Sequence, residues 1–136
     1  MAIVIFIIIL SLLVILHEFG HFLMAKKFGI GVEEFGIGIP PRIWGKKIGE
    51  TIYSVNWLPF GGFVRLVGED PTDKQKNAKN SFFVKKVWQR ALVVLAGVLV
   101  NATIAVGIFY FIVIGANFRL PFMAEVPVKY DFKFLD

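Results

Sequence analysis

The stretch AIVIFIIILSLLVILHEFGHFLMA, residues 2–25, decides the fold of this chain. A helix needs roughly 20 apolar residues to cross the hydrocarbon core of a bilayer, and this stretch exceeds that length. It is apolar on all sides, so it predicts a membrane-spanning helix without indicating a preferred face. Its second half nevertheless contains His17, Glu18 and His21. Ionisable side chains are costly at this depth, so these three residues call for a metal ion or a water-filled cavity, unless they lie inert at the wetted interface.

Composition excludes an ordinary soluble domain, because 57% of the 136 residues are hydrophobic. A second apolar segment, from Ala91 to Ala116, also has bilayer-spanning length. A cleaved signal peptide is the weaker interpretation of the first segment, because its basic residues, Lys26 and Lys27, follow it instead of preceding it. The predicted fold class is a membrane α-helical protein with a small β element. Two transmembrane helices are joined by a cytoplasmic, membrane-associated β-loop and linker.

The charge distribution predicts an orientation in the membrane. The net charge is +5, and 12 of the 15 Lys and Arg residues lie between Lys26 and Arg90. Loops rich in Lys and Arg stay on the cytoplasmic side, so we expect residues 27–90 in the cytoplasm and both termini outside. Acidic residues are interspersed in the same loop, which argues against a nucleic-acid partner. The chain has no cysteine, so a bound metal would need nitrogen and oxygen ligands.

The loop between the two apolar segments changes character along its length. Alternating polar and apolar residues predict strands at Thr51–Trp57 and Phe63–Val67, in a sheet too short to bury its own aromatic residues. These aromatic residues should therefore lean on the membrane or on the helices. Asn80 or Ser81 is the predicted N-cap of the next helix. We expect five parts: a transmembrane helix with the His-Glu motif (1–26), a β-loop (27–68), a polar linker (69–80), an interfacial segment with the second transmembrane helix (81–117), and an extracytoplasmic tail (118–136).

The spacing of His17 and His21 indicates a metal site. On a helix, residues four apart lie on one face, so the two imidazoles can bind one zinc ion. Glu18 follows the first ligand and is suited to act as general base toward a water that the metal activates, and later to protonate the leaving amine. These residue types at this spacing predict zinc-dependent peptide hydrolysis.

A third zinc ligand is not evident. Catalytic zinc sites usually have three protein ligands and a water, but His17 and His21 are the only histidines. The second apolar segment contains no acidic residue, and acids elsewhere in the chain are poor candidates, among them Glu33, Glu34, Glu50, Glu69, Asp70, Asp73, Asp131 and Asp136. Asn101 is the only strongly polar side chain of the second segment. It is suited either to bind the backbone of a substrate or to make an interhelical hydrogen bond. Gly97 and Gly107 would let another helix approach closely.

Three motifs in order resemble the site-2 protease family of intramembrane zinc metalloproteases (M50), and in particular the bacterial branch that includes the regulator-of-sigma-E protease. The first is the motif His17 to His21 itself. The others resemble the family's β-loop and the entry to its second span, and the resemblance covers residues 1 to about 118. The matching residues are Phe35-Gly36-Ile37-Gly38, then Gly61 to Leu66 with Gly68-Glu69, then Ser81-Phe82, Trp88-Gln89-Arg90 and Ala96-Gly97 up to Asn101.

The resemblance implies a zinc-dependent endopeptidase of a bacterial-type inner membrane, which cuts transmembrane segments of membrane protein substrates within the bilayer. It implies a β-loop that pairs with substrate, which makes Gly61, Gly62, Phe63 and Asn101 candidate substrate-binding residues. It also implies a C-terminal portion with a PDZ module and the third zinc ligand, so this chain would be the N-terminal catalytic portion. The alternative is a catalytically inactive membrane fragment, or pseudoprotease, that acts as a binding partner. A transporter-like proton relay is the least favoured interpretation.

Overall fold

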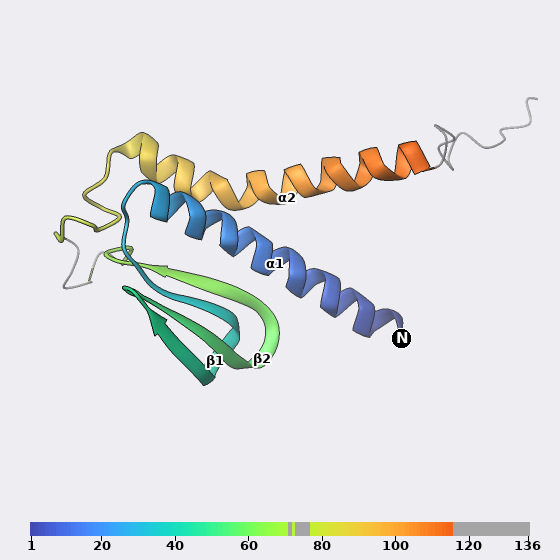
Figure 1. The fold of residues 1–136 in the computed structure, drawn as a ribbon, viewed down its shortest axis with the longest axis horizontal. Coiled ribbons are helices and arrows are strands. Elements are labelled where there is room, and N and C mark those ends of the chain that lie inside the picture. Colours follow the sequence, from blue (N-terminus) through green and yellow to red (C-terminus); the bar gives the residue numbers. More distant parts are fainter. Residues whose placement is uncertain (71, 73–76, 116–136) are drawn as a thin grey trace, which may run out of the picture. The chain divides into compact units, whose positions relative to one another are not determined.

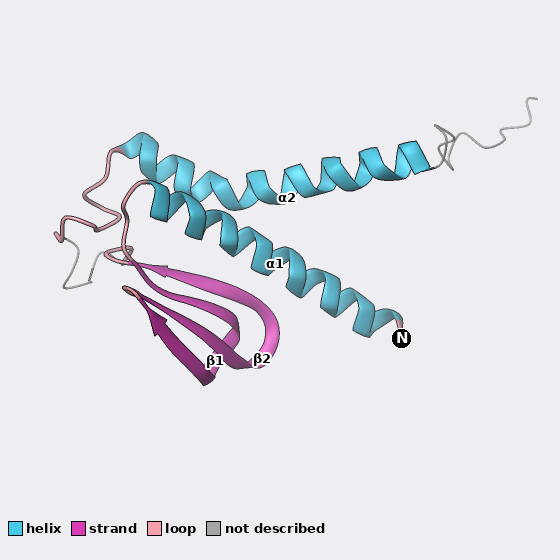
Figure 2. Ribbon diagram, viewed as in Figure 1, coloured by secondary structure: helices cyan, strands magenta, loops and turns pink. Residues whose placement is uncertain are grey.

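The structure is a computed structural model that describes residues 1–70, 72 and 77–115. Residues 1–103 form one compact unit, and the second unit begins at residue 104. The elements follow in the order α1 (Ala2–Lys27), β1 (Val32–Ile48), β2 (Thr51–Leu66) and α2 (Val87–Gly115), as Figures 1 and 2 show. The predicted tail, the middle of the predicted linker and the last two residues of the predicted 81–117 part lie outside the described residues.

Helices α1 and α2 have the length and surface of membrane spans. With 26 and 29 residues, they extend about 39 and 43 Å at 1.5 Å per residue, beyond the roughly 30 Å of bilayer hydrocarbon. Large apolar side chains such as Phe6 and Phe111 are exposed along them. Both helices are long and apolar enough to cross a membrane. The predicted fold class is confirmed: two membrane helices are joined by a β-containing loop.

The predicted cap of the second helix is wrong. Ser81 lies in a turn, where its Oγ accepts a backbone N–H two residues further on at 3.2 Å. Helix α2 begins only at Val87, and the side chain of Gln89 closes its first turn by accepting the N–H of Lys86 at 3.1 Å. Glutamine at this position of the first turn is a recognised partner for the N–H that precedes a helix. The cap is therefore Lys86, six residues after Asn80 and five after Ser81.

Backbone pairing explains the late start of α2. The carbonyl of Asn80 accepts the N–H of Gly31 at 2.8 Å, and the N–H of Phe82 donates to the carbonyl of Val67 at 2.8 Å. These bonds tie the chain to the end of the sheet. Because the backbone groups of this segment are already hydrogen-bonded at the end of the sheet, the helix cannot begin there.

Strands β1 and β2 pair antiparallel, and each doubles back on itself (Figure 2). The hairpin between them closes at Ile48 and Thr51, and the far ends meet at Val32 and Leu66. The doubling also sets Glu34–Ile37 beside Ile52–Val55, so that Glu34 lies opposite Ile52 and Ile37 lies opposite Val55. The sheet is thus four short pieces in the order 42–48, 51–56, 32–37 and 62–66. Both predicted strands lie within β2, although Val67 falls just beyond its end.

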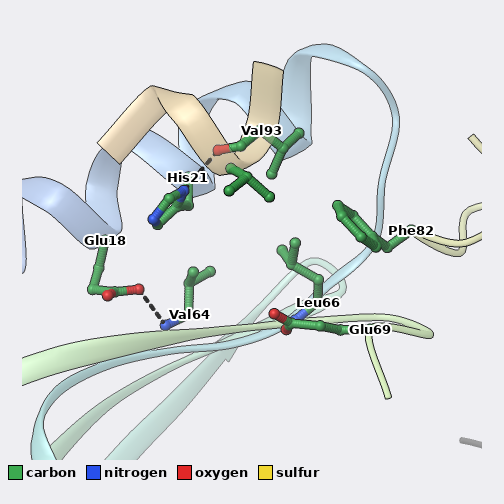
Figure 3. A pocket seen from close by; sticks show the side chains of 8 residues that line it. Glu18, His21, Val64, Leu66, Glu69, Phe82 and Val93 are labelled. Carbon is green, nitrogen blue, oxygen red and sulfur yellow. Dashed lines mark hydrogen bonds between the residues drawn. The ribbon is translucent and has the colours of Figure 1, made fainter. Parts of the chain in front are cut away.

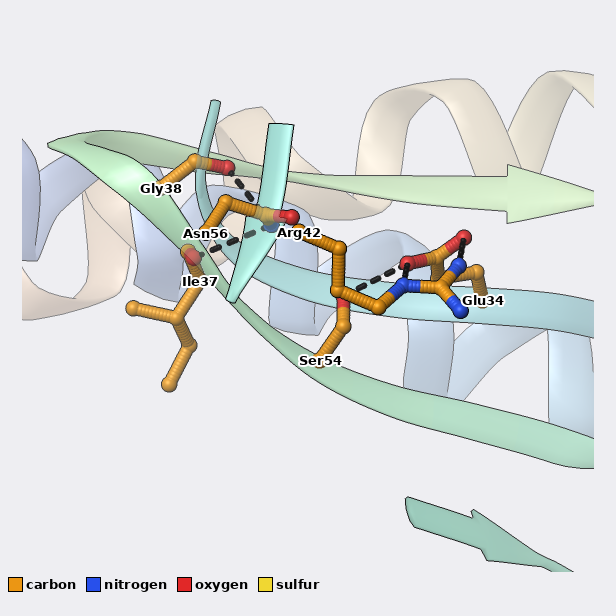
Figure 4. A network of polar contacts seen from close by, with 6 residues as sticks. All are labelled: Glu34, Ile37, Gly38, Arg42, Ser54 and Asn56. Atoms are coloured by element: carbon orange, nitrogen blue, oxygen red, sulfur yellow. Dashed lines mark hydrogen bonds and ion pairs between the residues drawn. The ribbon is translucent and has the colours of Figure 1, made fainter. Parts of the chain in front are cut away.

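A polar network holds the folded-back sheet together (Figure 4). Glu34, only 5% exposed, accepts two bonds from Arg42, at 2.6 and 3.1 Å, and a third from the Ser54 hydroxyl at 2.6 Å. Charge-assisted, bidentate pairs of this kind are among the stronger hydrogen bonds in proteins. Because Arg42 lies past the bend from Glu34, the pair links two pieces of β1.

The bend of β1 depends on Gly38 and Asn56. Gly38 has φ of +80°, and a Cβ there would collide with the carbonyl oxygen of Leu58. Asn56 donates to the carbonyls of Ile37 and Gly38 at 3.1 and 3.2 Å. The peptide bond between Pro40 and Pro41, at the tip of the bend, is cis. The two backbone carbonyls at the bend are thus hydrogen-bonded by one buried amide side chain.

The core lies where the C-terminal end of α1, the start of β1 and the first turns of α2 meet. Its buried members are Ala25, Ile30, Val32, Leu66 and Val93. Aromatic rings of the sheet also pack on α1: the ring of Phe22 lies 5.3 Å from that of Phe35 and 6.1 Å from that of Tyr53, between centroids. The expectation that the aromatic residues of the loop lean on a helix is confirmed for Phe35 and Tyr53, whereas Trp44 and Trp57 are exposed.

Candidate metal centre and active site

Helix α1 brings His17, Glu18 and His21 together. Their potential ligand atoms all lie within 4.8 Å of one another, and all three residues are half-buried. The two imidazole centroids are 4.7 Å apart with an angle of 82° between the rings. Within the described part of the chain, this is the one cluster of three residues with metal-ligating side chains at such a spacing.

The protonation of His21 follows from its partner. Its Nδ1 lies 2.7 Å from the carbonyl oxygen of Val93 in α2 (Figure 3). A carbonyl can only accept a hydrogen bond, so Nδ1 carries the hydrogen. In the neutral ring, the lone pair of Nε2 is then available for a metal. Metal-binding histidines commonly donate their second ring N–H in this way, which fixes the tautomer and the ring orientation.

Two glycines allow α2 to come this close. A Cβ on Gly20 would lie 2.7 Å from the carbonyl oxygen of Ala96. A Cβ on Gly97 would lie 2.6 Å from Nε2 of His21 and 2.7 Å from Nε2 of His17. Both Nε2 atoms therefore converge on the space that a side chain at position 97 would fill. Two neutral nitrogens converging on such a space, with a carboxylate beside them, fit a zinc ion.

The carboxylate of Glu18 points away from its helix toward the sheet. Its Oε2 accepts the backbone N–H of Val64 at 3.2 Å. Between α1, β2 and α2 lies a cavity of about 270 Å³, large enough for several water molecules. Figure 3 shows the residues that line it: Glu18, His21, Val64, Leu66, Glu69, Phe82, Val93 and Val94. The site thus combines potential metal ligands, a carboxylate and an accessible strand.

The candidate substrate-binding residues occupy different surroundings. A Cβ on Gly61 would lie 3.0 Å from Cγ1 of Val14, and one on Gly62 would lie 2.7 Å from the carbonyl oxygen of Gly36. The visible role of these glycines is to let β2 pack closely on α1 and β1. Phe63 packs its ring over Gly36. Substrate contact by these three residues stays a prediction.

Asn101 lies one turn beyond Gly97, on the face of α2 that also presents Val93 to α1. Its Oδ1 is buried and has no hydrogen-bond partner among the described residues. Buried polar atoms are nearly always bonded, so an unpaired one is a candidate contact for a ligand. A bond from a substrate or one from another helix would each satisfy this oxygen, so both roles left open for Asn101 stay predictions.

Sequence reasoning missed two parts of the site. The carbonyl of Val93 leaves no mark in a sequence, because every residue has one. Glu69 is a poor ligand candidate by its place in the loop, yet it lines the same cavity as Glu18 and His21. The signal for Glu69 is its place two residues after a predicted strand, in the motif that ends Gly68-Glu69.

Comparison with known proteins identifies the family of this chain. The profile of "Peptidase family M50" matches residues 5–133. A candidate zinc metalloprotease of Clostridium perfringens is 41% identical over 116 residues, which cover 85% of this chain and 34% of that protein. The zinc metalloprotease RasP of Geobacillus kaustophilus is 49% identical over 70 residues, or 52% of this chain and 17% of the relative.

The regulator of sigma-W protease RasP of Bacillus subtilis is 53% identical over 66 residues, which are 48% of this chain and 16% of that protein. The chain spans about a third or less of the length of the curated relatives that it matches. The family match extends over nearly all of the chain. The resemblance to the site-2 proteases is confirmed, and the chain belongs to peptidase family M50.

Proposed function

We propose that this chain carries the catalytic N-terminal portion of a zinc-dependent intramembrane endopeptidase, which hydrolyses peptide bonds in transmembrane segments of substrate proteins. One observation carries the proposal. The Nε2 atoms of His17 and His21 converge on Gly97, and the carbonyl of Val93 fixes the tautomer of His21. Relatives named as zinc metalloproteases support the choice of metal. The position of the motif in an apolar helix supports chemistry within the membrane.

In this proposal His17 and His21 hold the zinc ion. Zinc, when bound, supplies Lewis acidity that activates water and polarises a peptide carbonyl. Glu18 removes a proton from the attacking water as its oxygen bonds to the carbonyl carbon. It then delivers that proton to the amide nitrogen as the C–N bond breaks, so a carboxylic acid and an amine leave the site.

The free side of β2 is the proposed substrate platform. Hydrolysis needs an extended backbone, and a strand edge binds such a backbone through main-chain hydrogen bonds. Val64 lies beside Glu18, so a chain paired there would pass the base. Oδ1 of Asn101 would accept an N–H of the same substrate, and Gly61, Gly62 and Phe63 would form the strand that it approaches.

The surroundings of the site are proposed from charge and family. The excess of Lys and Arg between the spans supports a cytoplasmic position for residues 27–90, with both termini outside. The lipid bilayer would cover the exposed apolar faces of α1 and α2. The third zinc ligand would come from a C-terminal portion with a PDZ module, as the resemblance to the site-2 proteases implies.

The substitution Glu18→Gln tests the proposal in the whole protein that contains this chain. It keeps the size and the hydrogen bond to Val64 but removes the base. We expect zinc binding to persist, while cleavage of a reporter transmembrane substrate falls about 10²- to 10⁴-fold. Zinc content by metal analysis and product formation in detergent are the measurements. Unchanged cleavage would exclude Glu18 as the base. Absence of both zinc and cleavage in the wild-type protein would favour an inactive binding partner.

A further inference from the structure

The last piece of β2 has one side that β1 does not cover. The N–H of Val67 donates to the carbonyl of Gly31, the residue just before β1, at 2.9 Å, so this N–H faces the side of β1. Backbone groups alternate in direction along a strand. The N–H groups of Val64 and Leu66 therefore face the opposite side, where the cavity lies. This side is the free edge that an extended substrate would need.

Two carboxylates occupy this free edge. Oε2 of Glu18 accepts the N–H of Val64 at 3.2 Å, and Oε2 of Glu69 accepts the N–H of Leu66 at 3.3 Å (Figure 3). The two acids come from different elements, one from α1 and one from the loop after β2. They satisfy alternate N–H groups of the strand, as the carbonyl oxygens of a neighbouring strand would.

Both bonds are long for a carboxylate. Charge-assisted N–H···O bonds usually measure about 2.7–2.9 Å. Glu69 is exposed, so its carboxylate can exchange this bond for water at little cost. The turn that ends β2 has its own support, because the N–H of Glu69 donates to the carbonyl of Leu66 at 3.4 Å and Gly68 has φ of +65°. The side chain of Glu69 is therefore not needed to close the turn.

We propose that Glu69 is a displaceable cap on the substrate-binding edge, which holds the N–H of Leu66 until an extended main chain replaces it. This inference rests on the proposed function, because it assumes that a peptide pairs with β2. Glu69 is a positioning residue in this scheme. Only a substrate with free carbonyl oxygens at alternate residues can replace Glu69 on the strand. A helical substrate cannot replace it, because its carbonyls are already hydrogen-bonded within the helix.

The same exchange would free the proposed base. A peptide carbonyl that takes the N–H of Val64 displaces the carboxylate of Glu18 from the strand. That carboxylate then becomes available on the side of His17 and His21. Occupation of the edge would thus be coupled to release of the base, and an empty edge would keep Glu18 engaged.

Peptide binding to the metal-free whole protein in detergent tests the cap without requiring catalysis. The probe is a fluorescent, extended apolar peptide, read by fluorescence polarisation. Its control is the same peptide with the backbone nitrogens that pair with the strand methylated. We expect Glu69→Ala to tighten binding of the unmodified peptide about two- to tenfold, because a competing hydrogen bond is removed. Glu69→Gln should tighten it less, because a neutral oxygen is a weaker acceptor.

The matched control is Glu50→Ala, which removes the same charge at the exposed hairpin turn of the sheet and should leave affinity unchanged. In the active protein, Glu69→Ala should lower KM and leave kcat within about twofold. Unchanged or weaker peptide binding by both Glu69 variants would overturn the cap. Because peptide binding is measured without metal, this failure is distinct from a failure of Glu18→Gln to abolish cleavage.

Discussion

Glu18 and Glu34 are both glutamates turned away from bulk solvent, yet their surroundings differ. Glu34 is 5% exposed and accepts three hydrogen bonds, two from Arg42 and one from Ser54 (Figure 4). Glu18 is half-buried, and the bond found for its carboxylate is a single one of 3.2 Å to a backbone N–H. The carboxylate of Glu34 is held by three hydrogen bonds, and its charge is balanced by that of Arg42. The carboxylate of Glu18 keeps most of its acceptor capacity for other partners.

The difference separates a structural acid from a chemical one. A buried charge is tolerated when its partners satisfy it, and such a network holds one conformation. A general base must instead be able to exchange its partner for a reacting proton. The bonds around each carboxylate, more than its burial, distinguish the two roles. The following substitutions test this distinction, and the largest expected effect comes first.

Gly97→Ala should disable the metal site while leaving the network of Glu34 intact. The new Cβ would lie within 2.6–2.7 Å of ring atoms of both histidines, and these ring ends can yield where backbone could not. Displaced Nε2 atoms no longer converge, so we expect zinc affinity to fall at least about tenfold, as for lost orientation of a metal ligand. Zinc titration with a competing chelator measures the loss.

Gly107→Ala is the control for this change, because a Cβ there meets nothing within 4 Å in the described structure. It should preserve zinc affinity, and alanine is the better helix former. Equal zinc affinities for the two variants would show that the histidines do not need the space at Gly97.

Arg42→Ala should leave Glu34 with a single hydrogen bond, as Glu18 has, and should lower the stability of the protein without changing the metal site. Breaking a buried ion pair usually costs about 3–5 kcal/mol, but the side chain of Arg42 is 44% exposed, so we expect about 2–3 kcal/mol. Thermal unfolding in detergent, compared with that of the exposed neighbour variant Lys46→Ala, measures the loss. Zinc affinity should stay within about twofold. A stability equal to that of Lys46→Ala would mean that the network does not hold the bend.

Asp70 extends the comparison to a fully exposed carboxylate. Loss of its partner in Thr72→Ala should have the smallest effect of these substitutions. The hydroxyl of Thr72 donates to Oδ1 of Asp70 at 2.7 Å and its backbone N–H at 2.8 Å, which lowers the pKa of Asp70 below its ordinary value of 3.8. A lowered pKa stabilises the fold above pH 3.8, and this contribution is lost as the pH falls through the folded-state value. NMR titration of the carboxyl carbon should find the lowered pKa. Thr72→Ala should return it toward 3.8 and leave cleavage unchanged.

The spans and the motif were predictable because their signals are local. A helix in hydrocarbon needs only length and apolarity, and a zinc pair on a helix needs only spacing. The N-cap at Asn80 or Ser81 failed because backbone bonds to Gly31 and Val67 hold that segment against the sheet. Those bonds join residues far apart in the chain, and no local propensity encodes them.

The sequence by itself determined that this chain enters a membrane and that His17, Glu18 and His21 share one helix. The tertiary structure alone decided what surrounds them. It brought Gly97 beside both imidazoles, turned the carbonyl of Val93 onto His21, and set Glu18 and Glu69 on one strand edge. The physical reason is that periodicity fixes which side chains share a face, whereas the partner of a face depends on close packing between segments distant in sequence.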